Sequence, residues 1–200
     1  MAELLLGDGL AHAGTISNYD RPSREDAGQF GLGEIPLSEQ HWYAVSVRPR
    51  HEKAVTIHLE NRGLACFLPV YRSVRSWKDR RKELDMVLFP GYIFVRLDLR
   101  NRIRVLQAPG AVRFVTFQGH PAPVQDSQLQ ALASGLTAGL RAEPHPYLRR
   151  GRRVRVVRGP LANTEGILVR RKERFRLVLS VDLIMRSVML EVDESEVEAC

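Results

Sequence analysis

The side chains that could take part in catalysis or hold a metal are few and scattered along this chain of 200 residues. The two cysteines, Cys66 and Cys200, form no C-x-x-C pair of the kind that binds zinc or cycles as a disulfide. Cys66 lies among apolar residues, where a thiol is more often an inert part of a core than a reactive group. The histidines also lack the spacing of a metal site or a catalytic base: His41, His51, His58, His120 and His145. The sequence therefore predicts no catalytic residue, no metal and no cofactor.

The charged residues instead indicate binding. The net charge is +7, and it is unevenly spread. Residues 1–40 carry two Lys/Arg against seven Asp/Glu, residues 41–134 carry fifteen against seven, and residues 149–200 carry twelve against eight. A basic body behind an acidic leading segment suggests a polyanionic partner near the body. Charge alone leaves proteins that bind no nucleic acid equally open.

A basic cluster, RSWKDRRKEL at 75–84, lies between two strand-like segments, 64–74 and 85–97. Together they predict a long hairpin with a basic tip. Basic side chains attract phosphates in a salt-dependent way, and a tryptophan can stack on an exposed base. The candidate nucleic-acid-binding residues are Trp77, Lys78, Arg80, Arg81 and Lys82. An ordinary solvated charged loop is the alternative.

The elements that would position these residues begin at His41. Residues 41–48 alternate apolar and polar side chains, which predicts a strand, and residues 51–63 predict an amphipathic helix that stops at Gly63. Residues 111–117 predict another strand. Ser127 and Gln130 have the spacing of a capping box, and a helical face follows it: Leu129, Leu132, Ala133 and Leu136. This order predicts an α+β domain over 41–136, with helices on an antiparallel sheet.

The segments on either side of this domain have different compositions. Residues 1–40 show little apolar periodicity and are predicted to be a flexible tail. Residues 137–149 contain Gly139, Pro144 and Pro146, which suits a linker. From residue 150 to 200, short alternating segments predict four or five strands and hence a small β-barrel.

The hydrophobic fraction of 44% is ordinary for a soluble protein, and no apolar run approaches the ~20 residues needed to cross a bilayer. The first residues, MAELLLGDGLAHAG, place no basic residue ahead of their apolar stretch, so they are a poor secretory signal. Few cysteines suit a reducing compartment. We therefore expect a cytoplasmic protein without membrane contact, and we expect it to be a monomer.

The order of these elements and several local motifs resemble the NusG family over residues 42–197. WY at 42–43, LFPGYIFV at 88–95 and APGAVRFV at 108–115 are similar to its N-terminal (NGN) domain. GRRVRVVRGPLANTEGILV at 151–169 is similar to its KOW motif, and VMLEVDESEVE at 188–198 to its closing strand. The resemblance implies an NGN-type sheet domain linked to an SH3-like KOW barrel.

The resemblance also implies a function without catalysis, that of a transcription elongation and antitermination factor. In this family the N-terminal domain binds the clamp helices of the RNA polymerase β′ subunit and reaches toward the β lobe. Holding the clamp closed disfavours the paused state. The KOW domain recruits the termination factor Rho or a small-subunit ribosomal protein. The hairpin tip would lie near non-template DNA.

The polymerase-binding positions that the resemblance implies are Tyr92 and Phe94 on one strand, with Phe67, Leu68 and Pro69 nearby. Because strand alternation does not say which face is buried, these aromatic residues could instead belong to the core. Arg102 and Arg104 fall where family members contact the β gate loop. The His-Thr-Thr-Thr run of the specialised member RfaH is absent there.

In the KOW motif, the implied partner-binding residues are Gly159, Pro160, Leu161 and Gly166, with Leu161 where the family often has Phe. The stretches RPRHEK at 48–53 and LENRGLACFLP at 59–69 resemble the specialised, RfaH-like branch, which acts on selected operons. The alternative is a KOW-containing ribosomal or RNA-binding protein. That alternative explains the charge but not the complete first domain.

Overall fold

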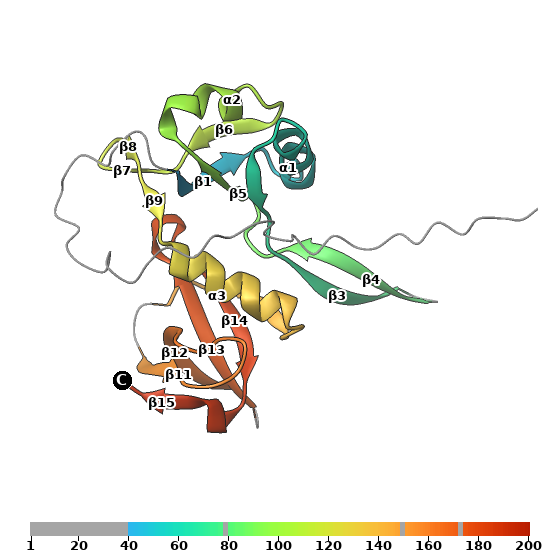
Figure 1. Ribbon diagram of the computed structural model, residues 1–200. Coiled ribbons are helices and arrows are strands. Elements are labelled where there is room, and N and C mark those ends of the chain that lie inside the picture. The colour runs from blue at the N-terminus through green and yellow to red at the C-terminus, as the bar shows by residue number, and fades with distance from the viewer. Residues whose placement is uncertain (1–39, 78–79, 149–150, 172–173) are drawn as a thin grey trace, which may run out of the picture.

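The computed structural model describes residues 40–77, 80–148, 151–171 and 174–200. The predicted tail, apart from Gln40, and the candidate Lys78 lie outside these ranges. The described chain forms two domains, each built on an antiparallel sheet, with one helix between them (Figure 1). The prediction of an α+β first domain followed by an all-β second domain is confirmed.

The first domain has a central sheet with strands in the order β2-β5-β1-β6, and β9 pairs with β1. The strands are β1 (His41–Val47), β2 (Ala65–Phe67), β5 (Tyr92–Leu97), β6 (Ala111–Phe114) and β9 (Pro123–Val124). On one face lie α1 (Glu52–Glu60) and α2 (Arg102–Leu106), the latter preceded by a 3-10 turn, η1 (Leu99–Asn101). Val45, Ile93 and Val95 are fully buried toward this face. The opposite face is buried too, so both faces of the sheet belong to the core.

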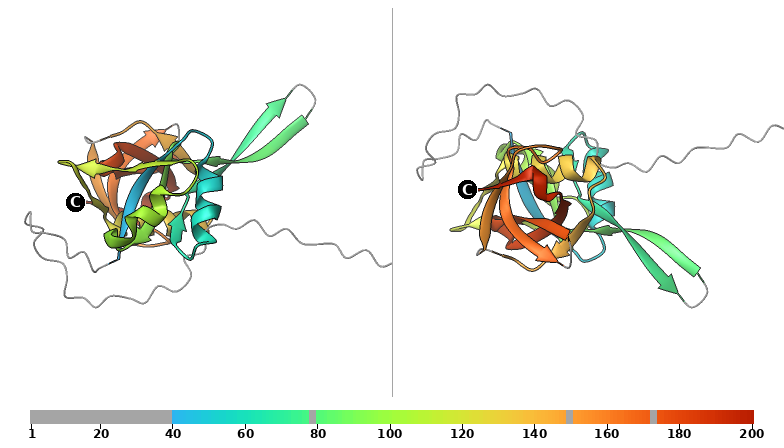
Figure 2. Two further views of the ribbon diagram at one scale, coloured as in Figure 1. Left: turned by 90° about the horizontal axis from the view of Figure 1, so that it is seen from above. Right: turned by 90° about the horizontal axis from the view of Figure 1, so that it is seen from below.

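A long hairpin leaves this domain between β2 and β5. Its strands are β3 (Val70–Trp77) and β4 (Arg80–Val87), which pair with each other and with no other strand. Both views of Figure 2 show it pointing away from the rest of the molecule. Its strands extend into the segment predicted as a basic tip, with the register described as far as Trp77 and Arg80. A smaller hairpin, β7 (Thr116–Phe117) and β8 (His120–Pro121), follows β6.

The helix between the domains is α3 (Asp126–Thr137). The predicted capping box is not formed, because the N-cap lies two residues earlier than Ser127: it is Gln125, and its side chain makes no capping hydrogen bond. The helix ends in a Schellman arrangement, in which Leu140 N–H donates to Gly135 C=O and Gly139 N–H donates to Leu136 C=O. With twelve residues, α3 is too short to span a membrane, and no other helix in the described ranges meets that requirement.

The second domain is a six-stranded sheet in the order β10-β14-β13-β12-β11-β15. Its strands are β10 (Ala142–His145), β11 (Arg152–Val156), β12 (Glu165–Arg171), β13 (Arg174–Val181), β14 (Arg186–Val192) and β15 (Val197–Ala199). Two 3-10 turns, η2 (Asp182–Ile184) and η3 (Glu194–Glu196), join them. β10 lies inside the segment predicted as a linker and pairs with β14 from Ala142 to His145. The part of that segment between α3 and β10 is therefore short.

The two domains share one hydrophobic core. Leu129, Leu132 and Ala133 of α3 cluster with Phe94 of the first sheet and with buried residues of the second domain, such as Leu190. At Gly135 the helix lies close to the second domain: a Cβ added there would lie 3.1 Å from Leu161 Cδ2 and 3.3 Å from Leu190 Cδ1. The absence of a side chain at this position therefore permits the close approach.

Candidate protein-docking groove between the domains

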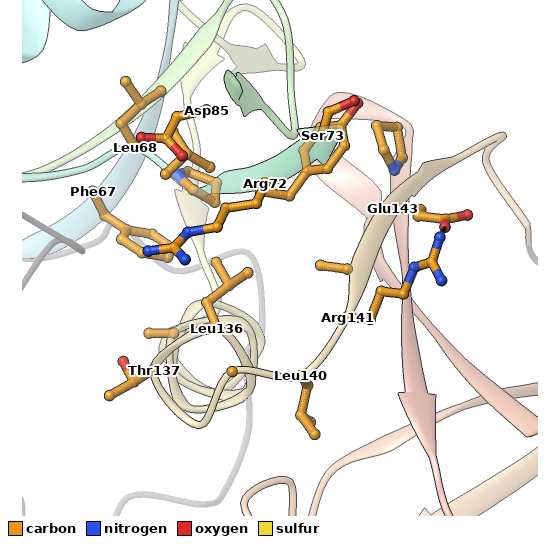
Figure 3. Close-up of a pocket in the computed structure, with 17 residues that line it drawn as sticks. Phe67, Leu68, Arg72, Ser73, Asp85, Leu136, Thr137, Leu140, Arg141 and Glu143 are labelled. Carbon is orange, nitrogen blue, oxygen red and sulfur yellow. Dashed lines mark ion pairs between the residues drawn. The ribbon is translucent and has the colours of Figure 1, made fainter. Parts of the chain in front are cut away.

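A groove of about 1120 Å³ runs along the junction of the two domains (Figure 3). One wall consists of residues 67–73 with Asp85, at the base of the hairpin. The other wall consists of the end of α3, the turn after it and β10. Both domains therefore contribute to this site.

The groove is lined by both apolar and charged side chains. Leu68 and Tyr71 on the hairpin side and Leu136 and Leu140 on the other are partly exposed, so their apolar surface is available. Leu136 and Leu140 come from α3 and from the turn that follows it (Figure 3). Partly exposed apolar side chains beside charged ones are typical of a protein-binding surface.

The rim carries both signs of charge. Arg141 pairs with Glu143 at 3.1 Å, and the same carboxylate lies 3.3 Å from Arg176, whose side chain is 9% exposed. On the hairpin, Arg72 is in register with Asp85. The rim charges of the second domain are thus largely paired with one another, which leaves the apolar side chains as the main contribution to binding.

Five residues proposed from the sequence as polymerase-binding lie at or beside this groove. Phe67, Leu68 and Pro69 line it. The exposure expected for Phe94 is not observed: its side chain is 0% exposed, and its ring packs against Phe67 at 6.2 Å and against Phe89 at 5.8 Å. Tyr92 is partly buried against the same cluster. The reason is that α3 and the second domain cover the aromatic face of the sheet.

Arg102 and Arg104 lie on the other side of the first domain, on α2. Both are exposed. Arg104 donates to the carbonyl oxygen of Arg62 at 2.7 Å, and Arg62 donates to the carbonyl of Arg104 at 3.4 Å, which ties α2 to the end of α1. These arginines therefore form a site separate from the groove, and Arg104 has a structural contact as well.

The candidate nucleic-acid residues lie at the far end of the hairpin. The register pairs Trp77 with Arg80, Ser76 with Arg81, and Arg75 with Lys82. Arg75, which the sequence reading did not single out, is thus opposite another cation. Like charges directly opposite each other destabilise a hairpin unless something neutralises them.

In the KOW motif the four candidate residues are separated by the fold. Gly159 and Pro160 are exposed in the turn after β11, whereas Leu161 is 2% exposed and packs against Gly135 of α3. Gly166 lies on β12, where a Cβ would come within 2.9 Å of the Val178 carbonyl oxygen. Gly166 is therefore needed for packing, and Leu161 is covered in this domain arrangement.

The sequence reading missed Tyr71, Leu136 and Leu140 as groove residues. Leu136 was assigned to the core face of its helix, and Leu140 to the linker. Tyr71 had a usable signal, since an aromatic residue two positions after Pro69 lies on the same side of a strand. The position of Leu140 depends on how the second domain docks, for which the sequence carries no local signal.

Chemically, the groove offers shape and apolar contact. Across the described part of the chain, no three His, Cys, Asp or Glu side chains gather as a metal site would require. The Cys66 thiol is partly buried, and burial raises its pKa to about 12, with Glu60 adding to the shift. The fold and the groove thus define a two-domain protein equipped to bind other macromolecules.

Comparison with known proteins shows a similarity to NusG. A sequence profile described as transcription termination factor NusG matches residues 40–133. The transcription termination/antitermination protein NusG of Escherichia coli K12 is 29% identical over 181 residues, covering 84% of this chain and 99% of that protein. The protein of the same name from Helicobacter pylori J99 is 26% identical over 170 residues, covering 78% and 97%. A solved structure on domain interaction in Thermotoga maritima NusG has 21% identity and a TM-score of 0.48, covering 81% of this chain and 98% of that one.

Residues 40–133 thus match the NusG family, and most of the chain is similar to transcription termination/antitermination proteins named NusG.

Proposed function

We propose that this protein binds RNA polymerase through the groove and the aromatic cluster beside it, and so suppresses pausing. The observation that carries the proposal is the position of Phe67, Leu68 and Pro69, which line the groove. The clamp helices of the β′ subunit are the expected ligand, and Arg102 and Arg104 are suited to a second contact toward the β lobe. Binding one state of the polymerase better than the other shifts its equilibrium without any chemical step.

Tyr92 and Phe94 contribute to this site in an indirect way. The ring of Phe94 packs against the ring of Phe67, with their centroids 6.2 Å apart. Phe94 is buried as long as α3 and the second domain remain docked on the sheet. We infer that Leu68 and Tyr71 make the first contacts with the polymerase. A full interface of the usual size, about 1,600 Å² in total, would need more surface than the groove alone exposes.

The second domain is proposed to recruit a further partner, Rho or a small-subunit ribosomal protein, through the turn at Gly159, Pro160 and Leu161. Leu161 is the apolar residue of that turn, and it packs on α3. Recruitment through Leu161 therefore requires the second domain to move off α3. The short connection between α3 and β10 is the place where such a movement would occur.

The hairpin is proposed to contact non-template DNA once the protein is on the polymerase. Its end combines Trp77 with Arg80, Arg81 and Lys82, and its register leaves Arg75 opposite Lys82. Basic side chains attract a phosphate backbone. The alternative, a KOW-containing ribosomal or RNA-binding protein, would also use this charge, but it gives no role to the groove between the domains.

We further propose that the protein is a specialised member of the family, of the RfaH-like branch, which acts as a monomer in the cytoplasm. The support is the sequence LENRGLACFLP at 59–69, which forms the end of α1, β2 and the groove wall. A position at the head of a long biosynthetic operon would support this assignment, and a position in a housekeeping gene cluster would contradict it.

The groove proposal is tested by Tyr71→Ala in the full chain, with binding to core RNA polymerase measured by biolayer interferometry. Removal of an aromatic anchor from an interface costs about 2 kcal/mol, so we expect binding about thirtyfold weaker. Phe117→Ala is the matched control, because Phe117 is an aromatic residue that is 61% exposed on β7 and does not line the groove. Circular dichroism checks the folding of both variants. Unchanged affinity in folded Tyr71→Ala would refute the groove as the docking site.

A further inference from the structure

The segment that connects α3 to the second domain forms part of that domain's sheet. Its strand, β10, pairs with β14 over Ala142–His145. One residue earlier, the Arg141 carbonyl oxygen accepts from Glu191 N–H of β14 at 3.1 Å. Residues 138–140 therefore make the whole connection between the end of α3 and the first backbone hydrogen bond to β14. We call residues 141–148 the strap.

The end of the strap is bound to one face of the second-domain sheet. Leu148 packs against a small apolar cluster that includes Met189. Leu148 N–H donates to Ser187 Oγ at 3.2 Å, and Ser180 Oγ donates to the Leu148 carbonyl oxygen at 3.0 Å. The two hydroxyl oxygens lie 2.8 Å apart, so the Ser187 hydroxyl donates to Ser180 and closes a ring of three hydrogen bonds. All these contacts lie within the second domain and do not involve α3.

An ion pair joins the middle of the strap to a buried cation. The Arg176 side chain, on β13, is 9% exposed, and its Nη1 lies 3.3 Å from Glu143 Oε2. In the part of the chain that the structure describes, Glu143 is the one acid that forms an ion pair with Arg176; the cross-strand neighbour Glu191 does not. A buried charge that loses its partner is strongly destabilised. Release of Glu143 is therefore unfavourable unless Arg176 becomes solvated at the same time.

We propose that Glu143 is a positioning residue, which holds the strap on the second domain by neutralising Arg176 and thereby limits how far that domain can move from α3. With the strap in place, residues 138–140 span at most about 10 Å. A strap released as far as Leu148 would extend the connection to residues 138–148, which span at most about 40 Å. The role of this limit in function rests on the proposed recruitment through Leu161, which requires the second domain to move off α3.

Hydrogen–deuterium exchange of the full chain, measured by mass spectrometry, tests how the strap is held. Glu143→Ala should accelerate exchange in peptides within 142–148 by about tenfold or more, because the strap then opens to let water reach Arg176. Peptides of β13 around Leu177 should change by less than about threefold, because the opening is local.

Glu165→Ala is the matched control. Glu165 lies on β12 of the same domain and pairs with Arg155, and both side chains are more than half exposed. An exposed ion pair contributes little to stability, so exchange in the strap should match that of the unmodified chain.

A double variant tests whether the charge of Arg176 is the reason. Arg176→Leu, added to Glu143→Ala, removes the buried cation, and replacement of a buried ion pair by apolar groups is often neutral. Exchange in the strap should then return to within about threefold of the unmodified chain. If Glu143→Ala alone does not fold, recovery of folding in the double variant supports the same cause.

The limit on movement is measured in chains that carry Gly135→Leu, a substitution whose side chain would clash with Leu161. Adding Glu143→Ala should increase the maximum dimension in small-angle X-ray scattering by on the order of 10 Å, because the connection becomes longer. Equal maximum dimensions with and without Glu143→Ala would contradict the limit.

Three exchange results would overturn the proposal: slow exchange of the strap in folded Glu143→Ala, equal acceleration in Glu165→Ala, or no recovery in the double variant. Equal acceleration in the strap and in β13 would also overturn it, because Glu143 would then support the whole sheet. None of these measurements involves the polymerase. A failure of the groove proposal, seen as unchanged polymerase binding by Tyr71→Ala, would leave the exchange results as they are.

Discussion

The two thiols of the chain differ in their surroundings, and so should their reactivity. Cys66 lies on β2, partly buried, and burial together with the nearby Glu60 carboxylate raises its pKa to about 12. Cys200 is exposed at the end of the second domain. Because the thiolate is the nucleophile, only a thiol with an accessible ionised form reacts quickly.

We expect iodoacetamide at pH 8 to modify Cys200 and to spare Cys66 in the folded chain. At four pH units below its pKa, only about one Cys66 in 10,000 is a thiolate. Intact-mass spectrometry should show one rapid addition, and a second only after denaturation. In Cys200→Ser the rapid addition should vanish. Two additions at similar rates in the native chain would mean that β2 is open to solvent.

Single residues also show how much of the site the sequence could reveal. Alternation along β5 correctly separates Phe94 from Ile93 and Val95, but it cannot say that both faces are covered. That information depends on α3 and the second domain, which are distant in sequence. Phe67, Leu68 and Pro69 were placed by family resemblance, whereas Tyr71 and Leu140 become groove residues only when the domains are docked.

Among the elements, α3 also shows that sequence periodicity predicts only part of the buried surface. The sequence predicts one apolar face, Leu129, Leu132, Ala133 and Leu136; the structure buries the first three and leaves Leu136 partly exposed. It also buries Ala131 and Gly135, which widens the buried arc to more than half of the helix. Ala131 and Gly135 are small and do not extend the apolar periodicity, so the sequence did not predict that this side of α3 contacts the second domain. An ordinary surface helix buries a stripe of about 100°, so the wider arc reflects two partners.

The strand β12 depends on Gly166 for its packing. A Cβ at this position would lie 2.8 Å from Leu177 Cδ1 and 2.9 Å from the Val178 carbonyl oxygen. Because a backbone oxygen in a paired strand cannot easily move, the sheet itself would have to shift. The glycine-rich motif recognised in the sequence therefore includes at least one position that serves the fold, whatever its role in binding.

Gly166→Ala should destabilise the second domain by about 2 kcal/mol, the usual cost of overpacking a tight site. The measurement is the free energy of unfolding in urea, followed by circular dichroism. Gly135→Ala is the matched comparison, since its Cβ would meet only the ends of flexible leucine side chains, at 3.1 Å or more. We expect Gly135→Ala to lower the free energy of unfolding by less than Gly166→Ala, because alanine also favours the helix. Equal effects at the two positions would contradict the packing argument.

For the whole molecule, the decisive feature is that one helix serves two domains. α3 packs against the first sheet, and at the same time Leu161 and Leu190 of the second domain pack against α3 at Gly135. The predicted linker could not have shown this, because its prolines and glycine suit a flexible connection as well as a turn followed by an edge strand. The docked arrangement places Leu161, a proposed partner-binding residue, inside the protein.

Gly135→Leu should separate the domains while leaving each of them folded. Leucine is a better helix former than glycine by roughly 1 kcal/mol, so α3 itself gains stability. Its side chain cannot fit where even a Cβ would lie 3.1 Å from Leu161 Cδ2. The substitution therefore stabilises α3 but destabilises the contact between the domains, and we expect that contact to break. Small-angle X-ray scattering should show a larger radius of gyration, and limited proteolysis should cut between α3 and β10.

Ser134→Leu is the control for this prediction, because Ser134 is the neighbouring residue on α3 and is exposed. It adds the same side chain to the same helix on the side away from Leu161, so scattering and proteolysis should match those of the unmodified chain. If Gly135→Leu also keeps its radius of gyration and its resistance to protease, the second domain is held in place by contacts other than the packing of Leu161 and Leu190 on α3. The requirement that Leu161 be released before it can bind a partner would then lose its structural basis.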